Sequence, residues 1–364
     1  MDSGHSIIRE SVSDNTLRLK ALRSDGAVMS SGVFTVRDTR FGGQYVKMLA
    51  VGGLETAPQF RRQGLVRELL AEGEAFGRER GAIIAILHPF SFAFYRKFGY
   101  ERVSDTVRVR FPLTALEFVP RYRELTPFTP ELLPAYLDYY DRFSKDRNLM
   151  PRLTADDIDP AGLYVLRDGG NISGHVILEK RQHFDGVNRM SPDGLYVKQL
   201  GFLSPGALAR VLGFLRMFEG EQLEVLLRDI GPTPEVGEFL KHYMHTSYDL
   251  RPDIMAKVLD VPAVLAACAY EASFAPFTLR VNDETFAVSA DTFAAGAAGL
   301  VQRVDDPAPA DLTVAPQALS RLVFGADKYT VDTARYLPGV EITAASGNAL
   351  AAFRKQINGW FEHF

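Results

Sequence analysis

The sequence of 364 residues holds a single cysteine, Cys268, so no disulfide framework can form within the chain. No apolar run approaches the roughly 18–20 residues that a membrane-spanning helix needs. The first residues lack the basic and apolar segments of a secretory signal. The formal net charge is only −4, which argues against nucleic acid as the main partner. These absences predict a cytoplasmic globular protein that binds neither membranes nor nucleic acid.

The most informative segment present is a basic loop at residues 57–67, in which three arginines surround Gly64. It follows an apolar, strand-like stretch at 46–54 and opens a helical pattern over 64–79. A helix start offers unpaired amides and the positive end of the helix dipole, and both favour a phosphate or pyrophosphate. The loop is neither a P-loop nor a GxGxxG turn. The alternative interpretation is an ordinary helix start with solvated arginines.

A second segment strengthens the first. Residues 81–87 form a short run rich in isoleucine, which is typical of a buried parallel strand. The string Phe-Tyr-Arg-Lys-Phe-Gly-Tyr-Glu follows at 94–101. Strand, helix and strand together predict a βαβ-like unit with the phosphate site at the start of its helix.

These two segments resemble the GNAT acyltransferase superfamily. The loop is similar to its acetyl-CoA pyrophosphate pattern, Arg/Gln-x-x-Gly-x-Gly/Ala, with Arg61, Gly64 and Val66 at the three positions. Val66 departs from the pattern at the last position. The string at 94–101 is similar to the FYxxxGF/Y signature that follows the fifth strand of these enzymes. The resemblance implies that acetyl-CoA is the co-substrate.

The C-terminal part extends the resemblance to nearly the whole chain. From about residue 276 the sequence predicts strands at 277–281, 285–288, 312–314 and 340–343, a helix through 318–324 and a final helix. Two GNAT halves followed by a sterol-carrier-protein-type module are the layout of the enhanced intracellular survival (Eis) acetyltransferase family. The resemblance implies a homo-oligomer, either a trimer or a hexamer.

The fold class expected from this layout is α+β or α/β, with mixed central sheets and flanking helices. A catalytic GNAT domain is expected at 1–122, a second GNAT-like domain at 123–261 and the carrier-like α+β domain at 262–364. The second half has the segment 201–206 where the first has its basic loop. That segment lacks paired arginines, so the second half is expected to be degenerate and not to bind CoA.

The family resemblance implies two catalytic groups. Tyr95 falls on the catalytic tyrosine, and a phenol with a pKa of about 10 is well matched to protonating a thiolate leaving group. Phe364 falls on the terminal residue whose α-carboxylate serves as base. Apolar residues recur every three or four positions from 350 to 364, which predicts a terminal helix with a docked end. The alternative interpretations are a packed core tyrosine and a terminal helix that only packs.

The remaining site predictions follow from the same segments. Backbone groups at 54–56 are expected to pair with the pantetheine, and amides at 62–67 to hold the pyrophosphate. The residues expected to contact acetyl-CoA are Leu54, Glu55, Thr56, Arg62, Gln63, Gly64, Leu65, Val66, Arg67, Phe90 and Ser91.

Several other residues are weighed as alternatives. Glu55 and His88 are competing bases, with a capping role preferred for His88. Tyr100 is the second candidate acid, but like Cys268 it is better interpreted as a core residue. Asp138, Asp141 and Asp146 form either an acidic rim for polyamines or a solvated helix face. His242 and His245 have no acidic partner at metal-ligand spacing, so they are interpreted as surface residues on a helix, and no metal site is expected.

The predicted function is therefore acetyl-CoA-dependent N-acetylation of a primary amine, by direct transfer in a ternary complex. The acceptor stays open among polyamines, aminoglycoside-like amines and lysine side chains. One departure bears on it. The family usually leads with a strand and two helices before the hairpin at 28–36 and 44–49, but only about 25 residues precede that hairpin here. The alternative function is a non-catalytic acyl-CoA or lipid-binding protein that uses the C-terminal module.

Overall fold

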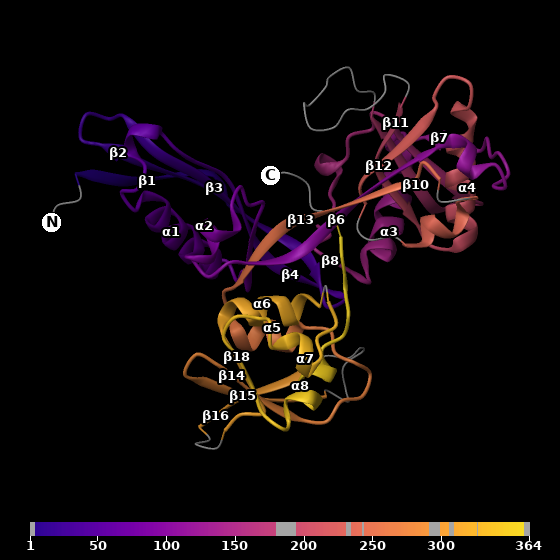
Figure 1. The fold of residues 1–364 in the computed structure, drawn as a ribbon. Coiled ribbons are helices and arrows are strands. Elements are labelled where there is room, and N and C mark those ends of the chain that lie inside the picture. The colour runs from indigo at the N-terminus through magenta and orange to yellow at the C-terminus, as the bar shows by residue number, and fades with distance from the viewer. Residues whose placement is uncertain are drawn as a thin grey trace. The chain divides into compact units, whose positions relative to one another are not determined.

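The computed structural model describes residues 4–179, 194–230, 234–241, 244–290, 299–305, 309–325 and 327–359. The chain divides into two compact units. Unit 1 consists of Met1–Ser104, Arg147–Pro151 and Asp253–Phe364, and unit 2 consists of Asp105–Asp146 and Arg152–Pro252. The fold is mixed α+β, as the sequence predicts (Figure 1). These units follow spatial contacts, so the predicted domain boundaries at 122 and 261 stay a prediction.

The first part of unit 1 is an edge-to-centre series of strands with one long helix. Its elements are β1 (His5–Ser13), β2 (Thr16–Arg23), β3 (Val28–Phe41), β4 (Gln44–Thr56), η1 (Pro58–Phe60), α1 (Leu65–Glu79), β5 (Ile84–Leu87) and α2 (Phe92–Arg96). The strands β3 and β4 form the predicted hairpin, and α1 connects β4 to the parallel strand β5. A Cβ atom at Gly73 would come within 2.1 Å of the Phe34 ring, so this glycine lets α1 approach β3 closely. The predicted βαβ-like unit is confirmed.

The residues ahead of the hairpin form two strands where the Eis family usually has a strand and two helices. The strands β1 and β2 pair antiparallel and extend the sheet beyond β3. Ion pairs from His5 to Glu68 at 2.9 Å and from Arg9 to Glu72 at 2.8 Å fasten β1 to α1. The described residues ahead of β3 therefore belong to the sheet.

The central strands of unit 1 are buried on both faces. On β4, Leu49 and Val51 pack in the cluster under α1, whereas Met48 and Ala50 pack in a second cluster shared with the C-terminal part. The strand β5 alternates in the same way, because side chains of successive strand residues point to opposite faces. The last part of β13 (Ser247–Val258) pairs antiparallel with β5. This double burial explains why 81–87 reads as a continuous apolar run.

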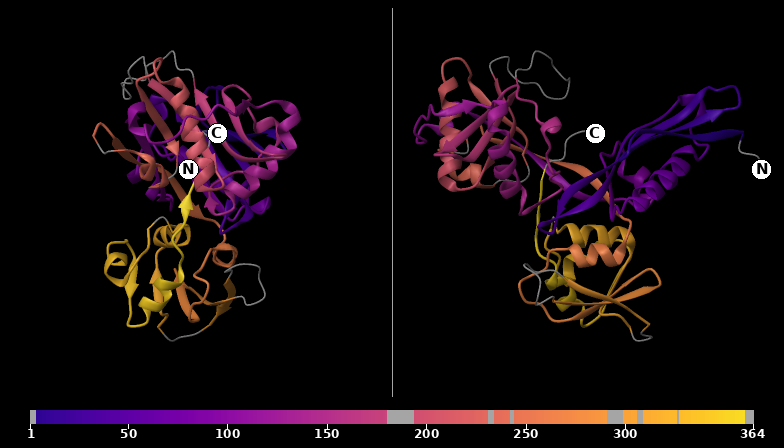
Figure 2. Two further views of the ribbon diagram at one scale, coloured as in Figure 1. Left: turned by 90° about the vertical axis from the view of Figure 1, so that its right-hand side faces the viewer. Right: turned by 180° about the vertical axis from the view of Figure 1, so that it is seen from behind.

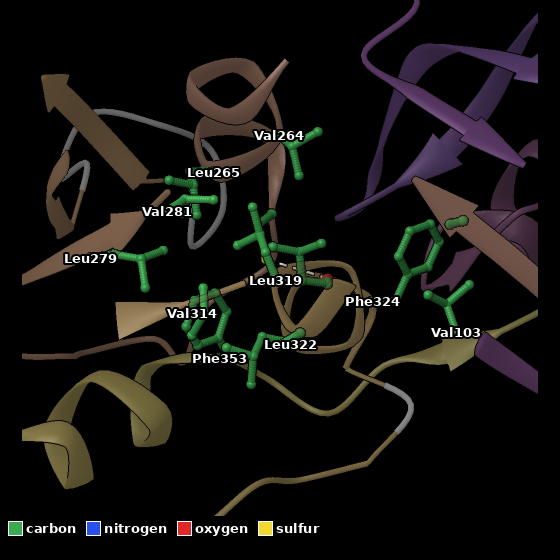
Figure 3. Close-up of a cluster of buried hydrophobic side chains, with 14 of the residues drawn as sticks. Val103, Val264, Leu265, Leu279, Val281, Val314, Leu319, Leu322, Phe324 and Phe353 are labelled. Atoms are coloured by element: carbon green, nitrogen blue, oxygen red, sulfur yellow. Dashed lines mark hydrogen bonds between the residues drawn. The ribbon is translucent and has the colours of Figure 1, made fainter. Parts of the chain in front are cut away.

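The C-terminal part of unit 1 is a smaller sheet with helices. Its elements are α5 (Val261–Ala267), β14 (Phe277–Val281), β15 (Glu284–Ala290), β16 (Gly299–Val304), β17 (Leu312–Val314), α6 (Pro316–Phe324), α7 (Val331–Ala334), β18 (Val340–Ile342) and α8 (Ser346–Ala352). The strand order is β16-β15-β14-β17-β18, and α5 and α6 lie along one face (Figure 2). Side chains such as Leu279 and Val314 meet Leu319 and Leu322 of α6 there (Figure 3). The predicted strands and the helix through 324 are confirmed.

The predicted final helix over 350–364 is wrong for the residues that the structure describes. The helix α8 ends at Ala352, and Phe353 is extended. The chain then forms β19 (Ile357–Asn358), which runs parallel to β8 (Arg147–Asn148). Backbone amides of this stretch donate to distant carbonyls, as Gln356 does to Gly325 at 2.7 Å, so they are not available for helical bonds. Residues 360–364 lie outside the described residues.

Unit 2 repeats the strand–helix–strand theme. Its elements are the end of β6 (Glu101–Pro112), η2 (Leu113–Leu116), β7 (Leu125–Pro127), η3 (Pro130–Leu132), α3 (Leu133–Ser144), η4 (Ala155–Asp157), β9 (Leu163–Asp168), β10 (Asn171–Glu179), β11 (Gly194–Phe202), α4 (Pro205–Leu215), η5 (Arg216–Phe218), β12 (Glu224–Ile230) and η6 (Pro234–Phe239). The strands β11 and β12 are parallel and α4 connects them. The strand order in this unit is β6-β12-β11-β10-β9-β7.

The two units exchange strands along the chain. After α2 the chain enters unit 2 through β6, whose end pairs with β12. After β12 it returns to unit 1 through β13, whose end pairs with β5. Each unit thus contains a strand segment that follows the other sequence half.

Candidate functional site

The basic loop makes an open start for α1. Arg62 and Gly64 adopt left-handed conformations, with φ of 63° and 87°. Gly64 is the N-cap of α1 and provides no side-chain hydrogen bond to the helix amides. A Cβ atom at Gly64 would meet nothing within 4 Å, so the space above it is open. The first amides of α1, at Leu65 and Val66, therefore face a place that a ligand can approach.

The charges around this helix start are not neutralised by neighbours. Arg61, Arg62 and Arg67 are exposed, and none of them forms an ion pair within the part of the chain that the structure describes. The Arg61 side chain donates to the backbone carbonyl of Thr56 at 3.4 Å. Uncapped amides, the helix dipole and guanidinium groups without ion pairs are the features that favour an anion at this helix start.

The pairing between β4 and β5 ends next to this site. Their parallel pairing runs from Met48 opposite Ile84 to Val51 opposite Leu87, where β5 ends. The strand β4 continues to Thr56, and its register against β3 shifts by one extra residue between Gly52 and Glu55. Gly53 has a φ of 57° within this bulge. The end of β4 thus presents a backbone edge on the β5 side that an extended ligand can pair with.

The end of β4 is held firmly from the β3 side. Ser30 is 2% exposed, and its hydroxyl donates to the carbonyl of Glu55 at 2.7 Å. It also lies 2.9 Å from the Thr56 hydroxyl. The amide of Ala57 donates to the carbonyl of Met29 at 3.0 Å. These contacts fix the direction of the strand end from which the basic loop departs.

Tyr95 lies on α2, which follows β5. The tyrosine is 3% exposed and its ring makes edge contacts with Phe90 and Phe94, at centroid distances of 5.3 and 5.2 Å. Burial raises the pKa of its phenol above the ordinary value, so the hydroxyl holds its proton at neutral pH. Among the described residues the hydroxyl has no hydrogen-bond partner, and it is not one of the fully buried polar atoms. A protonated, uncommitted phenol is what a general acid requires.

Three of the predicted segments meet in one hydrophobic cluster. Leu54 from the end of β4 and Val66 from the start of α1 pack against the cluster that contains Tyr95. Phe90 is 73% exposed and touches Tyr95, while the Ser91 hydroxyl accepts from the amide of Phe94 and caps α2. The remaining predicted contact residues that are exposed are Glu55, Arg62, Gln63, Gly64 and Arg67. The structure therefore brings the strand end, the basic loop and the tyrosine to one side of unit 1.

The competing bases differ in what they contact. The Glu55 side chain is exposed at the end of β4. The His88 ring follows the last residue of β5, and its Nδ1 lies 3.0 Å from Oδ1 of Asp253 on β13. The contact with Asp253 holds the His88 ring in one orientation. The predicted capping role of His88 is wrong, because the N-cap of α2 is Ser91.

Several alternatives are resolved by burial. Tyr100 is fully buried, donates to Glu74 at 3.1 Å and has a pKa raised well above its usual value by burial, so it is a core residue. Cys268 is 2% exposed just after α5, and burial raises the pKa of its thiol, which confirms a core role.

The other polar candidates belong to unit 2 or lie outside the described residues. Asp138, Asp141 and Asp146 are exposed residues of unit 2, and Asp138 pairs with Arg142 at 3.0 Å. His245 is exposed in a turn rather than on a helix. Within the described ranges no group of three or more His, Cys, Asp or Glu side chains could hold a metal ion. Phe364 and His242 lie outside the described residues.

Sequence reasoning missed three supporting residues. Asp253 is 165 positions from His88 and reaches it because β13 pairs with β5. Ser30 and Glu101 are likewise brought in by strand pairing and by a buried ion pair. No local pattern indicates the contacts of Asp253 and Ser30, whereas Glu101 lies only five residues from Arg96. The only signal for Asp253 is its place just ahead of an apolar strand.

The fold and the candidate site of the first part of unit 1 can now be compared with known classes of protein. Residues 10–103 match the family model described as "Acetyltransferase (GNAT) domain". The chain therefore carries an acyltransferase domain, and the GNAT fold implies acyl transfer from acetyl-CoA. The match spans β1 to the start of β6 and so includes the basic loop, α1 and Tyr95.

Solved structures match over nearly the whole chain. A GCN5-related N-acetyltransferase from Anabaena variabilis has a TM-score of 0.75 at 18% identity, over 94% of this chain and 88% of that one. One from Kribbella flavida has 0.74 at 19% identity, over 95% and 88%. Eis1 from Mycobacterium abscessus has 0.73 at 20% identity, over 95% and 91%. At these identities the likeness concerns the fold.

Two further findings complete the comparison. No curated protein sequence matches the chain. Among the described helices, none has the length and apolar character that crossing a membrane requires.

Proposed function

We propose that the protein is an Eis-like N-acetyltransferase that moves the acetyl group of acetyl-CoA to a primary amine by direct transfer in a ternary complex. The observation that carries the proposal is the meeting of three parts around one cluster: the end of β4 beyond its pairing with β5, the uncapped start of α1, and Tyr95. Each of these parts answers one requirement of acyl transfer: holding the thioester, holding its phosphates and protonating the leaving sulfur.

The residues present fit acetyl-CoA at both ends. Amides from Arg62 to Arg67 would hold the pyrophosphate, with the open space above Gly64 letting it approach the backbone. The edge of β4 at Leu54, Glu55 and Thr56 would pair with the amide-rich pantetheine arm. Phe90 and Ser91, between β5 and α2, would border the thioester end. Acetyl-CoA itself supplies the activated acetyl group.

Tyr95 would act as the general acid. Its phenol is protonated at neutral pH because burial raises its pKa, so it carries a proton that it can donate to the departing CoA thiolate. The surrounding rings of Phe90, Phe94 and Tyr100 hold the phenol in one orientation. The acid therefore needs no reorganisation at the moment of transfer.

The α-carboxylate of Phe364 would act as the base. With a reference pKa of about 3.5, a carboxylate serves by holding the ammonium or a water in line rather than by proton affinity alone. The chain reaches its last residues through β19, which is anchored in unit 1 by Asn148 and Asn358. Glu55 and the Asp253-held His88 are the alternatives if the terminus is not used.

The resemblance to the Eis acetyltransferase family also suggests the domain layout, the acceptor and the assembly. We extend the proposal to a catalytic domain at 1–122, a second GNAT-like domain at 123–261 and a sterol-carrier-protein-like module at 262–364. The acceptor would be a small polyamine, an aminoglycoside-like amine or a lysine side chain, and the assembly a trimer or hexamer. The strand–helix–strand repeat of unit 2 supports the tandem arrangement.

The experiment that tests the proposal measures CoA release from acetyl-CoA with a panel of multi-amine antibiotics, polyamines and a lysine peptide. The native chain is compared with chains extended at the C-terminus or, as the matched control, at the N-terminus. We expect turnover that collapses only with the C-terminal extension. Turnover indifferent to both extensions would move the base to Glu55 or His88. Acetyl-CoA binding without turnover of any amine would favour the binding-protein alternative.

A further inference from the structure

Tyr95 sits on a helix too short to hold its own position. The helix α2 has five residues and ends one residue after the tyrosine. So few residues form too few helical hydrogen bonds to be stable alone, so tertiary contacts must set the direction of α2. At its start the contact is the Ser91 cap. The contact at its end begins with the next residue, Arg96.

Arg96 forms a two-point ion pair with a buried carboxylate. Its Nε donates to Oε2 of Glu101 at 2.8 Å, and a terminal nitrogen donates to Oε1 at 2.7 Å. Glu101 is only 2% exposed, and the amide of Arg102 also donates to it, at 2.9 Å. Burial alone would raise the pKa of Glu101, but the hydrogen bonds from Arg96 and Arg102 outweigh it and lower the pKa. The carboxylate is therefore charged and fixes the guanidinium in two directions.

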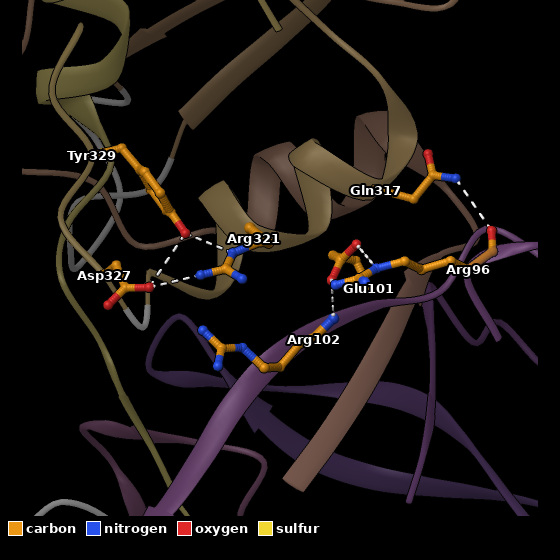
Figure 4. Close-up of polar contacts among 7 residues, drawn as sticks. All are labelled: Arg96, Glu101, Arg102, Gln317, Arg321, Asp327 and Tyr329. Carbon is orange, nitrogen blue, oxygen red and sulfur yellow. Dashed lines mark hydrogen bonds and ion pairs between the residues drawn. The ribbon is translucent and has the colours of Figure 1, made fainter. Parts of the chain in front are cut away.

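The C-terminal part of unit 1 reaches the same point. Gln317, near the start of α6, donates to the backbone carbonyl of Arg96 over 3.5 Å. One turn later on α6, the Arg321 guanidinium contributes positive charge that favours ionised Glu101. Arg321 is itself held by Tyr329 at 2.6 Å and Asp327 at 2.8 Å (Figure 4). The end of α2 thus lies against both a buried acid and a helix of another part of the chain.

We propose that Glu101 is a positioning residue for Tyr95, acting through Arg96, and that α6 supports this position from the C-terminal part. The proposal rests on the proposed role of Tyr95 as the acid. Arg96 directly follows Tyr95 in α2, so a shift of the Arg96 end turns the helix and displaces the phenol. A misplacement of about 1 Å in a catalytic group can lower the rate by up to about a hundredfold.

The central test is Glu101→Gln. Glutamine keeps the shape and removes the charge, and it leaves Arg96 half exposed to water rather than buried. The reverse change, Arg96→Ala, would strand a buried carboxylate and destabilise the fold, so it is a poorer test. We expect kcat to fall about tenfold, since the acid is displaced but present. The KM for acetyl-CoA should stay within about twofold, because the basic loop is untouched.

A double-mutant cycle separates positioning from general stability. In the Tyr95→Phe background, Glu101→Gln should have no further effect on kcat, since the group it positions is gone. Glu284→Gln is the matched control, because it removes a carboxylate that pairs with Arg303 at 2.7 Å in the C-terminal part of unit 1, outside the contacts of α2 and Arg321. It should leave kcat unchanged in both backgrounds.

Two results would overturn the proposal: an unchanged kcat in a folded Glu101→Gln variant, or an equal loss in both backgrounds. If Glu101→Gln does not fold, Gln317→Ala replaces it in the same cycle. That change removes only the long hydrogen bond to Arg96, so a loss of about twofold confined to the Tyr95 background is expected. Full activity of Tyr95→Phe alone would defeat the proposed role of the acid instead, which is a separate outcome.

Discussion

Two helices in this molecule connect parallel strands in the same way but differ in the chemistry of their first residues. The helix α1 joins the parallel strands β4 and β5, and α4 joins the parallel strands β11 and β12. At the start of α1 stands Gly64 with a φ of 87° and no capping side chain. At the start of α4, the Ser204 hydroxyl accepts from the amide of Ala207 at 3.2 Å, and Pro205 has no amide to offer.

The comparison indicates that the N-cap of the helix, and not the way the helix connects two parallel strands, decides whether helix amides are available to an anion. The Ser-Pro start of α4 satisfies one helix amide internally and deletes another, which stabilises a helix by about 1 kcal/mol and leaves little for a ligand. The start of α1 gives up that stabilisation and keeps its amides accessible, with unpaired arginines around them. We therefore predict that α1 binds acetyl-CoA and α4 does not.

The largest effect is expected from Tyr95→Phe, which removes the acid beside the open helix start. Without the proton donor, kcat should fall by about 10²–10⁴-fold, while acetyl-CoA binding persists. Because burial raises the phenol pKa above 10.0, activity that needs the protonated phenol is retained at neutral pH and lost only above pH 10. A pH–rate profile of the native chain and a direct binding assay of the variant check both parts.

Gly64→Val should make the start of α1 as inaccessible to a ligand as the start of α4. A β-branched residue is strained at a φ of 87° and would stand in the open space where the pyrophosphate approaches. We expect acetyl-CoA affinity to fall by at least about tenfold, or 1.4 kcal/mol. Gly26→Val is the matched control, because Gly26 has the same φ and equally open surroundings. Equal losses of affinity in both variants would contradict the comparison.

Smaller changes are expected when charge alone is removed. Arg62→Gln and Arg67→Gln should each weaken acetyl-CoA binding about three- to fivefold at low salt, and less at high salt, since exposed charges are screened. Arg335→Gln, an exposed arginine after α7, should leave binding unchanged. Titrations at two ionic strengths measure the difference. A salt-independent loss would mean that the arginines act by shape rather than charge.

The smallest effect concerns α4. Ser204→Ala removes the cap that α1 lacks, so the free energy of unfolding should fall by about 1 kcal/mol. Acetyl-CoA binding and kcat should not change. Denaturant unfolding combined with steady-state kinetics makes the check. A change in acetyl-CoA affinity would show that the second half takes part in binding after all.

Local sequence patterns predict those helices and strands whose signals lie within a few residues. The apolar run at 81–87, the helix after Gly64 and the strands at 277–281 and 285–288 are confirmed, because period and turn signals act within a few residues. The hairpin of β1 and β2 was available from the alternation of Leu17, Leu19 and Ala21, but it was not anticipated.

The misses share one cause. The stretch after Ala352 has a helical period, yet its amides bond to Gly325, Ala269 and Asn148 from distant segments. No periodicity encodes those partners. The same holds for the candidate site: the loop and Tyr95 stand out locally, but the contact of Asp253 with His88 depends on the pairing of β13 with β5. Sequence reasoning therefore found the reacting groups better than the groups that hold them.

The exchanged strands have a consequence for synthesis. Residues 1–104 emerge first, but β13 and the C-terminal part that cover Met48, Ala50, Ile84 and Ile86 come from beyond residue 252. At roughly 5–20 residues per second, the ribosome delivers them many seconds later. During that interval the apolar face of the nascent sheet is exposed to solvent and prone to aggregation. A cell that makes this protein must shelter an unfinished intermediate, and heat shock or chaperone shortage should reduce its yield before it affects the finished enzyme.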